Sequence, residues 1–298
     1  MKTRTLSSFK QSWRLIFVCL LSVSIITGCG SSGTDTTAGV GTGGTGVLAK
    51  AVTGTVADGY LVNATVFLDK NGNYQLDAGE QSTTTDTNGT YKLDVDLADV
   101  GKYPIVVLAI KGVTIDKDTN QTLASSYVLS LPKDSVNGTV NNFISPMSSQ
   151  IREMMETGAY TSLQQASDAL SSKLGLPVGT NMMVDYLQSN NTSIHTAAQN
   201  MSTLMGNQMG QIITMNGSTV TVDVNRYRGM MGLMFNNMSS SWCRSSQFSM
   251  GTLSNTMTTM LANTPTTPFG QPYWNMSTAY SNMMGRMGTS NSWMVGAY

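Results

Sequence analysis

The chain has 298 residues, of which only 11% are charged, and its 17 basic residues balance its 17 acidic residues. Four of the basic residues lie near the N-terminus in a segment that reads as an export signal, so the rest carries a net charge of about −4. This charge gives no indication of a nucleic-acid partner. With three cysteines and one histidine, the chain also lacks the residues for haem-attachment motifs or Cys/His zinc sites.

Residues 1–28 are predicted to be this export signal. Basic residues precede LIFVCLLSVSII, an apolar run of about a dozen residues that is too short to span a bilayer as a stable helix. The next residues, Ile26-Thr27-Gly28-Cys29, resemble the bacterial lipobox. That resemblance implies that Cys29 is acylated and becomes the first residue of a membrane-anchored protein. Gly30 after the cysteine implies sorting to the outer membrane, and an ordinary signal peptide with a chance cysteine is the alternative.

Residues 29–50 are rich in Gly, Ser and Thr without apolar periodicity, which predicts a flexible tether. With Cys19 in the signal and Cys29 carrying lipid, Cys243 has no partner for an intramolecular disulfide. We interpret Cys243 as a buried free thiol, with pairing to another chain as the alternative.

Residues 51–142 show the pattern of a β domain. TYKLDVDL alternates apolar and polar residues, and PIVVLAI is a nearly continuous apolar run, as expected for a central strand. Asn88-Gly89, between STTTD and TYKLDV, predicts a hairpin because glycine accepts the positive φ of such a turn. Some six or seven short strands in about 90 residues predict a small antiparallel sandwich.

Residues 143–210 are predicted to be helical. Ser145 and Pro146 form a typical helix start, and apolar residues from Ile194 to Met209 recur three and four apart. Glu153 and Glu156 lie one turn apart and are expected on a solvated face. His195 lacks a Ser or Cys placed for a catalytic triad, so we expect a surface or capping histidine.

Residues 211–298 are rich in Met, Asn, Ser and Thr. STVTVDV predicts a strand, but the rest fits loosely packed helix, irregular surface or disordered chain equally well. Thioethers are ligands for Cu(I), so copper binding by this region is the alternative function. Chance placement of the 21 methionines after residue 146 gives about three MxxM pairs, however, and packing or a pliable binding surface also explains their abundance.

The stretch DKNGNYQLDAGE carries oxygen ligands at the spacing of a calcium loop. Five side chains and one backbone carbonyl are the candidate ligands: Asp69, Asn71, Asn73, Gln75 through its carbonyl, Asp77 and Glu80. Leu76 fills the apolar eighth position that ties such loops to a core. Tyr74 replaces the glycine usual at the sixth position, and strands are predicted on both sides, which argues against an EF-hand.

The pattern of strand, D-x-N-x-N-x-x-x-D-x-G-E and strand resembles the B modules of serine-aspartate-repeat surface adhesins. Residues 53–95, with ADGYL, ATVFLD and TDTNGTY, are similar to the carboxypeptidase-regulatory or prealbumin-like modules of bacterial envelope lipoproteins. The resemblance implies a prealbumin-like β-sandwich and a structural calcium ion held weakly by the loop. Asp86 either completes the calcium shell or only forms its own turn, and a solvated hairpin without metal is the alternative for the whole loop.

The sequence thus predicts an α+β protein in which an antiparallel β-sandwich precedes a helical, Met-rich C-terminal region. NNFISPMSSQI followed by helices resembles a group of envelope lipoproteins. We therefore expect a non-enzymatic outer-membrane lipoprotein, anchored by lipid, with a structural role or with an envelope protein or surface glycan as its partner.

Overall fold

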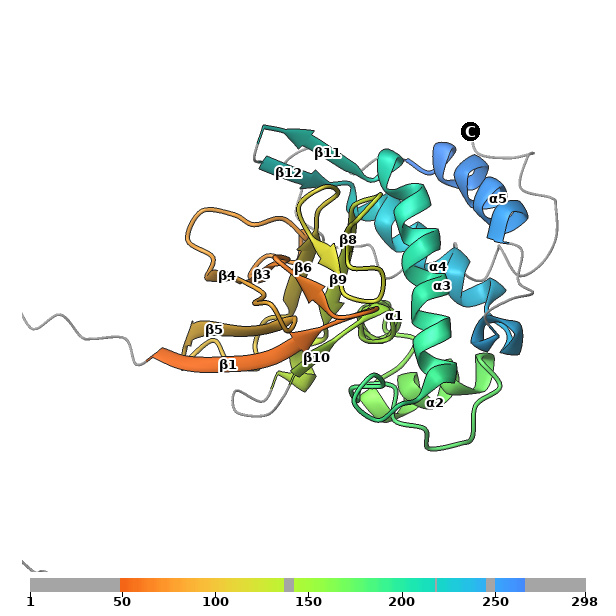
Figure 1. The fold of residues 1–298 in the computed structure, drawn as a ribbon, viewed down its shortest axis with the longest axis horizontal. Helices are drawn as coiled ribbons and strands as arrows, with labels where there is room; N and C mark the ends of the chain where they lie inside the picture. The colour runs from red at the N-terminus through yellow and green to blue at the C-terminus, as the bar shows by residue number, and fades with distance from the viewer. Residues whose placement is uncertain (1–48, 137–141, 218, 245–249, 266–298) are drawn as a thin grey trace, which may run out of the picture. The chain divides into compact units, whose positions relative to one another are not determined.

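The computed structural model describes residues 49–136, 142–217, 219–244 and 250–265, all within one compact unit. This part combines small sheets with helices, which confirms the predicted α+β class (Figure 1). The predicted signal peptide, Cys29 and the tether up to residue 48 lie outside the described residues, as do residues 266–298 of the Met-rich region.

The larger sheet has the strand order β4-β3-β6-β9, and all its pairs are antiparallel. Its strands are β3 (Thr65–Leu68), β4 (Ser82–Thr84), β6 (Ile105–Ala109) and β9 (Tyr127–Leu131). Every residue of β6 is buried, and the strand lies between two neighbours, as the apolar run PIVVLAI predicts. This sheet matters for function because the candidate calcium loop connects β3 to β4.

A second sheet has the order β10-β1-β5 and comprises β1 (Ala49–Val56), β5 (Thr90–Asp96) and β10 (Asn142–Ile144). β5 alternates exposed and buried residues as predicted and pairs antiparallel with β1, whereas β10 pairs parallel with β1. The all-antiparallel arrangement expected from the sequence is therefore wrong for β1 and β10. The parallel pair is possible because a long stretch of chain separates the two strands.

The hairpin predicted at Asn88-Gly89 is also wrong. The chain does turn there, with Gly89 at a φ of +73°, but β4 pairs with β3 and β5 pairs with β1. The turn therefore leads from one sheet to the other. A local turn signal fixes the change of direction, whereas the strand partner depends on which distant strand covers the buried face of β5.

Two smaller pairings complete the described strands. β2 (Leu61–Val62), β7 (Ile115–Asp116) and β8 (Gln121–Thr122) form a short sheet, and β11 (Ile213–Asn216) pairs with β12 (Thr219–Val222). β12 confirms the strand expected in STVTVDV.

The five α-helices described are α1 (Pro146–Glu156), α2 (Leu163–Lys173), α3 (Thr192–Gln208), α4 (Val224–Asn237) and α5 (Met250–Ala262). Three short 3-10 turns span Lys133–Ser135, Met209–Gln211 and Ser240–Cys243. α1 starts as predicted, because the hydroxyl groups of Ser145 and Ser148 each accept a hydrogen bond from the backbone N–H of the other. α4 and α5 show that this part of the Met-rich region is helical.

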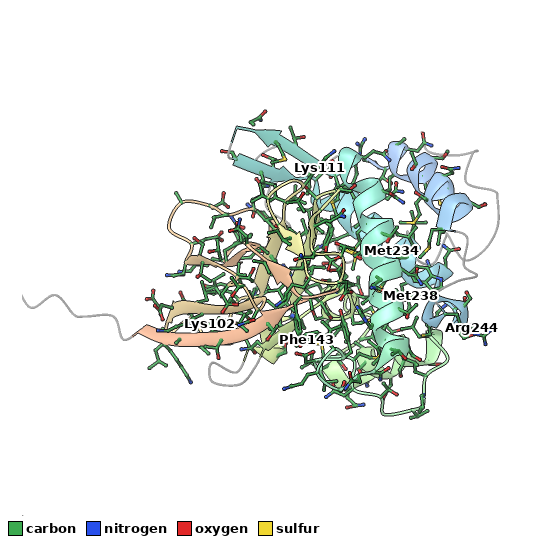
Figure 2. The ribbon with its side chains drawn as sticks, in the orientation of Figure 1. Lys102, Lys111, Phe143, Met234, Met238 and Arg244 are labelled. Atoms are coloured by element: carbon green, nitrogen blue, oxygen red, sulfur yellow. The ribbon has the colours of Figure 1, made fainter. Side chains whose placement is uncertain are left out.

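Helix α1 is buried on all sides from Pro146 to Met154, and it lies between the sheets and the other helices (Figure 1). It contacts β9, β10, α2, α3 and α4. One hydrophobic core extends through sheets and helices and includes Phe143 and Met234, whose side chains are labelled in Figure 2. Among the described residues, no helix is both long and apolar enough to cross a membrane.

Candidate calcium loop and its contact with helix α1

Asp69, the first candidate ligand, directly follows β3 and is completely buried. Its Oδ1 accepts hydrogen bonds from the backbone N–H groups of Gly72 (2.9 Å) and Asn73 (3.1 Å), and its Oδ2 accepts one from Tyr74 (3.3 Å). Gly72 and Tyr74 both have positive φ, +74° and +62°. The Asp69 carboxylate therefore folds the first half of the loop around itself.

Three candidate ligands converge at Asp77. The side-chain amides of Asn71 and Asn73 each donate to Oδ2 of Asp77 over 2.7 Å. Rotating either amide by half a turn would bring its oxygen, a calcium ligand, to the same position. The two asparagines and Asp77 thus meet as the sequence pattern predicts.

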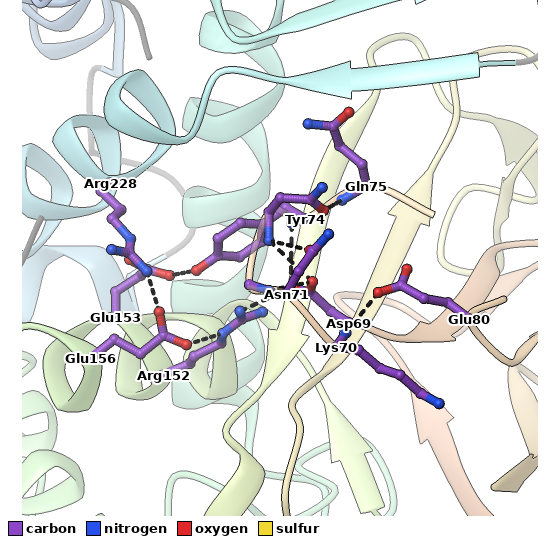
Figure 3. A network of polar contacts seen from close by, with 12 residues as sticks. Asp69, Lys70, Asn71, Tyr74, Gln75, Glu80, Arg152, Glu153, Glu156 and Arg228 are labelled. Atoms are coloured by element: carbon purple, nitrogen blue, oxygen red, sulfur yellow. Dashed lines mark hydrogen bonds and ion pairs between the residues drawn. The ribbon is translucent and has the colours of Figure 1, made fainter. Parts of the chain in front are cut away.

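Glu80 closes the loop in a different way. Its Oε1 accepts from the backbone N–H of Lys70 (2.7 Å) and its Oε2 from that of Asp77 (3.0 Å), so one carboxylate holds both ends of the loop. Partial burial raises the pKa of Glu80, although these two hydrogen bonds lower it. Gln75 points its side chain away from the other ligands (Figure 3), and its backbone N–H donates to Oδ1 of Asn73 (2.8 Å).

Tyr74 anchors the loop in the core. Its side chain is fully buried, its ring centroid lies 4.7 Å from that of Tyr227 on α4, and its hydroxyl donates to Oε1 of Glu153 (Figure 3). Leu76, expected to fill this role, is 39% exposed. That expectation is wrong because Tyr74 offers a larger apolar ring and a hydroxyl that finds a buried partner.

Arg152 joins the loop to α1. Its Nη2 lies 3.1 Å from Oδ2 of Asp69, its Nε donates to Oε1 of Glu156 over 2.7 Å, and its guanidinium lies 4.0 Å from the centroid of the Tyr74 ring. The side chain is only 1% exposed. A buried cation is thus held by two carboxylates and an aromatic face.

The expectation of a solvated face is wrong for Glu153, whereas Glu156 keeps 31% of its side chain exposed. Glu153 is fully buried, its Oε2 lies 3.4 Å from Nε of Arg228, and Arg228 also forms an ion pair with Glu156 (Figure 3). Burial raises the pKa of Glu153 to about 6, against the opposing effect of Arg228. Desolvation also raises the pKa of Glu156, but the charges of Arg152 and Arg228 outweigh this effect and hold the pKa below its usual value. The two glutamates do lie one helical turn apart, as their spacing predicts. The arginine that pairs with both, Arg228 on α4, is remote in sequence.

A second buried polar cluster surrounds the Asp58-Gly59-Tyr60 turn. Oδ2 of Asp58 accepts from the hydroxyl of Tyr127 over 2.9 Å, and burial raises the pKa of Asp58 to about 6. Nearby, Nε2 of His195 lies 2.7 Å from Oδ2 of Asp118, and the His195 ring stacks on Tyr186. His195 is thus a partly buried link between α3 and the β7–β8 turn and does not cap a helix.

The remaining sequence candidates have structural partners. Asp86 accepts from the backbone N–H groups of Asn88 and Thr90 and from the Thr90 hydroxyl, which is ordinary turn chemistry. Cys243 is a half-buried free thiol whose Sγ lies 3.6 Å from the carbonyl oxygen of Leu174, and burial raises its pKa. Met231 and Met234, one MxxM pair, are both fully buried in α4.

Calcium binding by the loop stays a prediction. Among the described residues, no three His, Cys, Asp or Glu side chains gather as a metal site, so the loop would depend on its two asparagines together with Asp77. Asp69 fits less well, because a fixed guanidinium already shares its charge. Comparison of the chain with protein-family models, curated proteins and solved structures found no match.

Proposed function

We propose that this protein is a non-enzymatic outer-membrane lipoprotein with a prealbumin-like sandwich, and that loop 69–80 holds a structural calcium ion. The carrying observation is the convergence of the Asn71 and Asn73 amides on the carboxylate of Asp77 between β3 and β4. Calcium prefers such hard oxygen ligands in flexible geometry. Its charge would neutralise the acidic half of the loop and stabilise the connection between the two strands.

The residues divide this task. Asn71, Asn73 and Asp77 would contact the ion, the carbonyl of Gln75 lies on the same segment, and Glu80 already fixes the ends of the loop through Lys70 and Asp77. Asp69 would contribute only part of its charge because it is paired with Arg152. Weak affinity, in the sub-millimolar to millimolar range of extracellular modules, is consistent with this arrangement.

Thermal melting of the mature chain with millimolar calcium and with a chelator tests the site. Millimolar calcium is at most about 10 times a Kd in this range, and a ligand that binds only the folded state at that excess adds about 1.4 kcal/mol of stability. For a chain of this size this raises Tm by roughly 3–6 °C. Asp77→Ala should abolish the shift, whereas the matched control Asp86→Ala should keep it. A wild-type Tm that is the same with calcium and chelator would refute the calcium site.

Lipid attachment is tested independently. Metabolic labelling with a radioactive fatty acid should mark the wild type and not Cys29→Ser, and the labelled protein should fractionate with the outer membrane. Label on both proteins, or on neither, would contradict the anchor at Cys29. We propose only the class of the partner, which is an envelope protein or a surface glycan. A pull-down from intact envelopes with and without chelator would identify it.

The described methionines favour packing over copper binding. Met231 and Met234 lie within the core, and Met257 is also fully buried, so their thioethers act as adaptable apolar contacts. A Cu(I) titration of the full mature chain distinguishes the two roles, because stoichiometric binding is expected only for the copper alternative.

A further inference from the structure

We propose that Arg152 competes with calcium for Asp69, so that calcium binding and the attachment of loop 69–80 to α1 oppose each other. This inference rests on the calcium site proposed above and concerns its regulation. It assigns a role to a residue that lies outside the calcium-loop pattern, some 80 positions along the chain from Asp69.

The guanidinium of Arg152 cannot easily leave Asp69. Nη2 faces Oδ2 of Asp69 at 3.1 Å, Nε faces Glu156 at 2.7 Å, and the ring of Tyr74 lies against it at 4.0 Å. Arg152 and Asp69 are 1% and 0% exposed. Because three neighbours fix the guanidinium and water is excluded, a second cation that approaches Asp69 must compete with this charge.

Asp69 has little remaining capacity for a second cation. Its two oxygens already accept from three backbone N–H groups as well as from Arg152. A divalent ion drawing on the same carboxylate meets both a weakened ligand and a fixed positive charge in a poorly solvated position. Arg152 therefore lowers the affinity of the loop for calcium.

Thermodynamic reciprocity gives the second half of the inference. If Arg152 weakens calcium binding, then bound calcium must weaken the pair between Asp69 and Arg152 by the same factor. That pair lies beside Tyr74, whose ring contacts Arg152 and whose hydroxyl contacts Glu153. Calcium would thus stiffen the loop around Asp77 while loosening its attachment to α1. Arg152 is therefore a positioning residue, which sets the balance between the loop attached to α1 and the loop with calcium bound.

Calorimetric calcium titration of the mature chain tests the competition. A charge within a few ångströms shifts the proton affinity of a carboxylate by about one to three orders of magnitude, and the same field acts on a metal cation at that carboxylate. We therefore expect Arg152→Gln to bind calcium at least about 10-fold more tightly than the wild type. Arg152→Lys keeps the charge and should stay near the wild-type Kd.

The matched control is Arg228→Gln. Arg228 belongs to the same buried cluster but contacts Glu153 and Glu156 and not Asp69. Its removal should change the calcium Kd by less than about 3-fold, because the effect declines with distance. The inference is overturned, and the calcium site is kept, if the wild type binds calcium and both variants bind it equally more tightly. The same conclusion follows if Arg152→Gln binds calcium no more tightly than the wild type. A wild type without calcium binding overturns both.

A second measurement uses the wild type alone, in case Arg152→Gln does not fold. Amide hydrogen exchange should become slower with calcium at residues 71–77 of the loop, apart from Tyr74. It should become faster at Tyr74 and in the last turn of α1, where Arg152 and Glu156 lie. Exchange that slows throughout both segments would show that calcium reinforces the attachment, which contradicts the competition.

Discussion

The hydroxyl of Tyr74 allows a sharp test of the contact between loop and helix. Tyr74→Phe removes only the hydrogen bond to Glu153 and leaves the buried ring in place. A hydrogen bond to a charged group contributes about 1.5–3 kcal/mol, and one between neutral groups about 0.5–1.5 kcal/mol. Because burial raises the pKa of Glu153 to about 6, its carboxyl is ionised at pH 7.5 and mostly protonated at pH 5. The cost should therefore be about 2 kcal/mol at pH 7.5 and about 1 kcal/mol at pH 5.

Chemical denaturation at the two pH values measures this difference, and Tm should fall by roughly 4–8 °C at pH 7.5. Tyr227→Phe is the matched control, because Tyr227 is also fully buried but its hydroxyl donates to the neutral carbonyl of Val128 over 3.2 Å. Its cost should be about 1 kcal/mol at both pH values. If Tyr74→Phe costs no more than Tyr227→Phe at pH 7.5, or costs the same at both pH values, the assigned role of Glu153 is refuted.

Two further predictions concern the rest of the fold. Burial raises the pKa of Asp58 from 3.8 to about 6, so the folded state retains a proton that the unfolded state loses. Stability from this group is complete below the unfolded pKa of 3.8 and falls by about 3 kcal/mol in total as the pH rises through the folded pKa of about 6. Asp58→Asn should remove this part of the wild-type pH dependence in denaturant titrations. Gly54→Ala would place a Cβ 2.0 Å from the carbonyl oxygen of Asn142 and should cost about 3 kcal/mol, whereas Gly210→Ala, with no atom within 4 Å of its Cβ, should leave Tm nearly unchanged. Equal Tm values for the two alanine variants would contradict the close pairing of β1 with β10.

Local chemistry explains the predictions that succeeded. The start of α1 at Ser145 and Pro146 depends on a cap formed within four residues, and β5 shows its alternation in every residue of the strand. The turn at Gly89 is equally local, but the partner of β5 is not, which is why the hairpin prediction failed. Loop 69–80 was predicted as a candidate calcium loop from spacing alone, since its candidate ligands lie on one short segment.

Glu153 and Glu156 show why the remainder of the site was not predictable. Acidic residues one turn apart on a polar helix normally face water, and nothing within SPMSSQIREMME indicates that this helix is buried on all sides as far as Met154, which includes Glu153. Their neutralising partner Arg228 lies more than 70 residues further along the chain. Tyr74 carried the one available signal, because a bulky residue at the usual glycine position requires compensation elsewhere.

That compensation lies in the contacts of Tyr74 with the core. A tyrosine at a φ of +62° is strained by about 1–2 kcal/mol, which full burial of its ring and the bond to Glu153 more than offset. Arg152 then supplies at Asp69 the positive charge that calcium supplies in a typical loop of this spacing. If the loop binds calcium as proposed, loss of the ion need not unfold it, because Asp69 remains neutralised by Arg152. The ion would act at Asp77, whose described contacts include no arginine, and its effect on stability should therefore be graded with concentration rather than all or none.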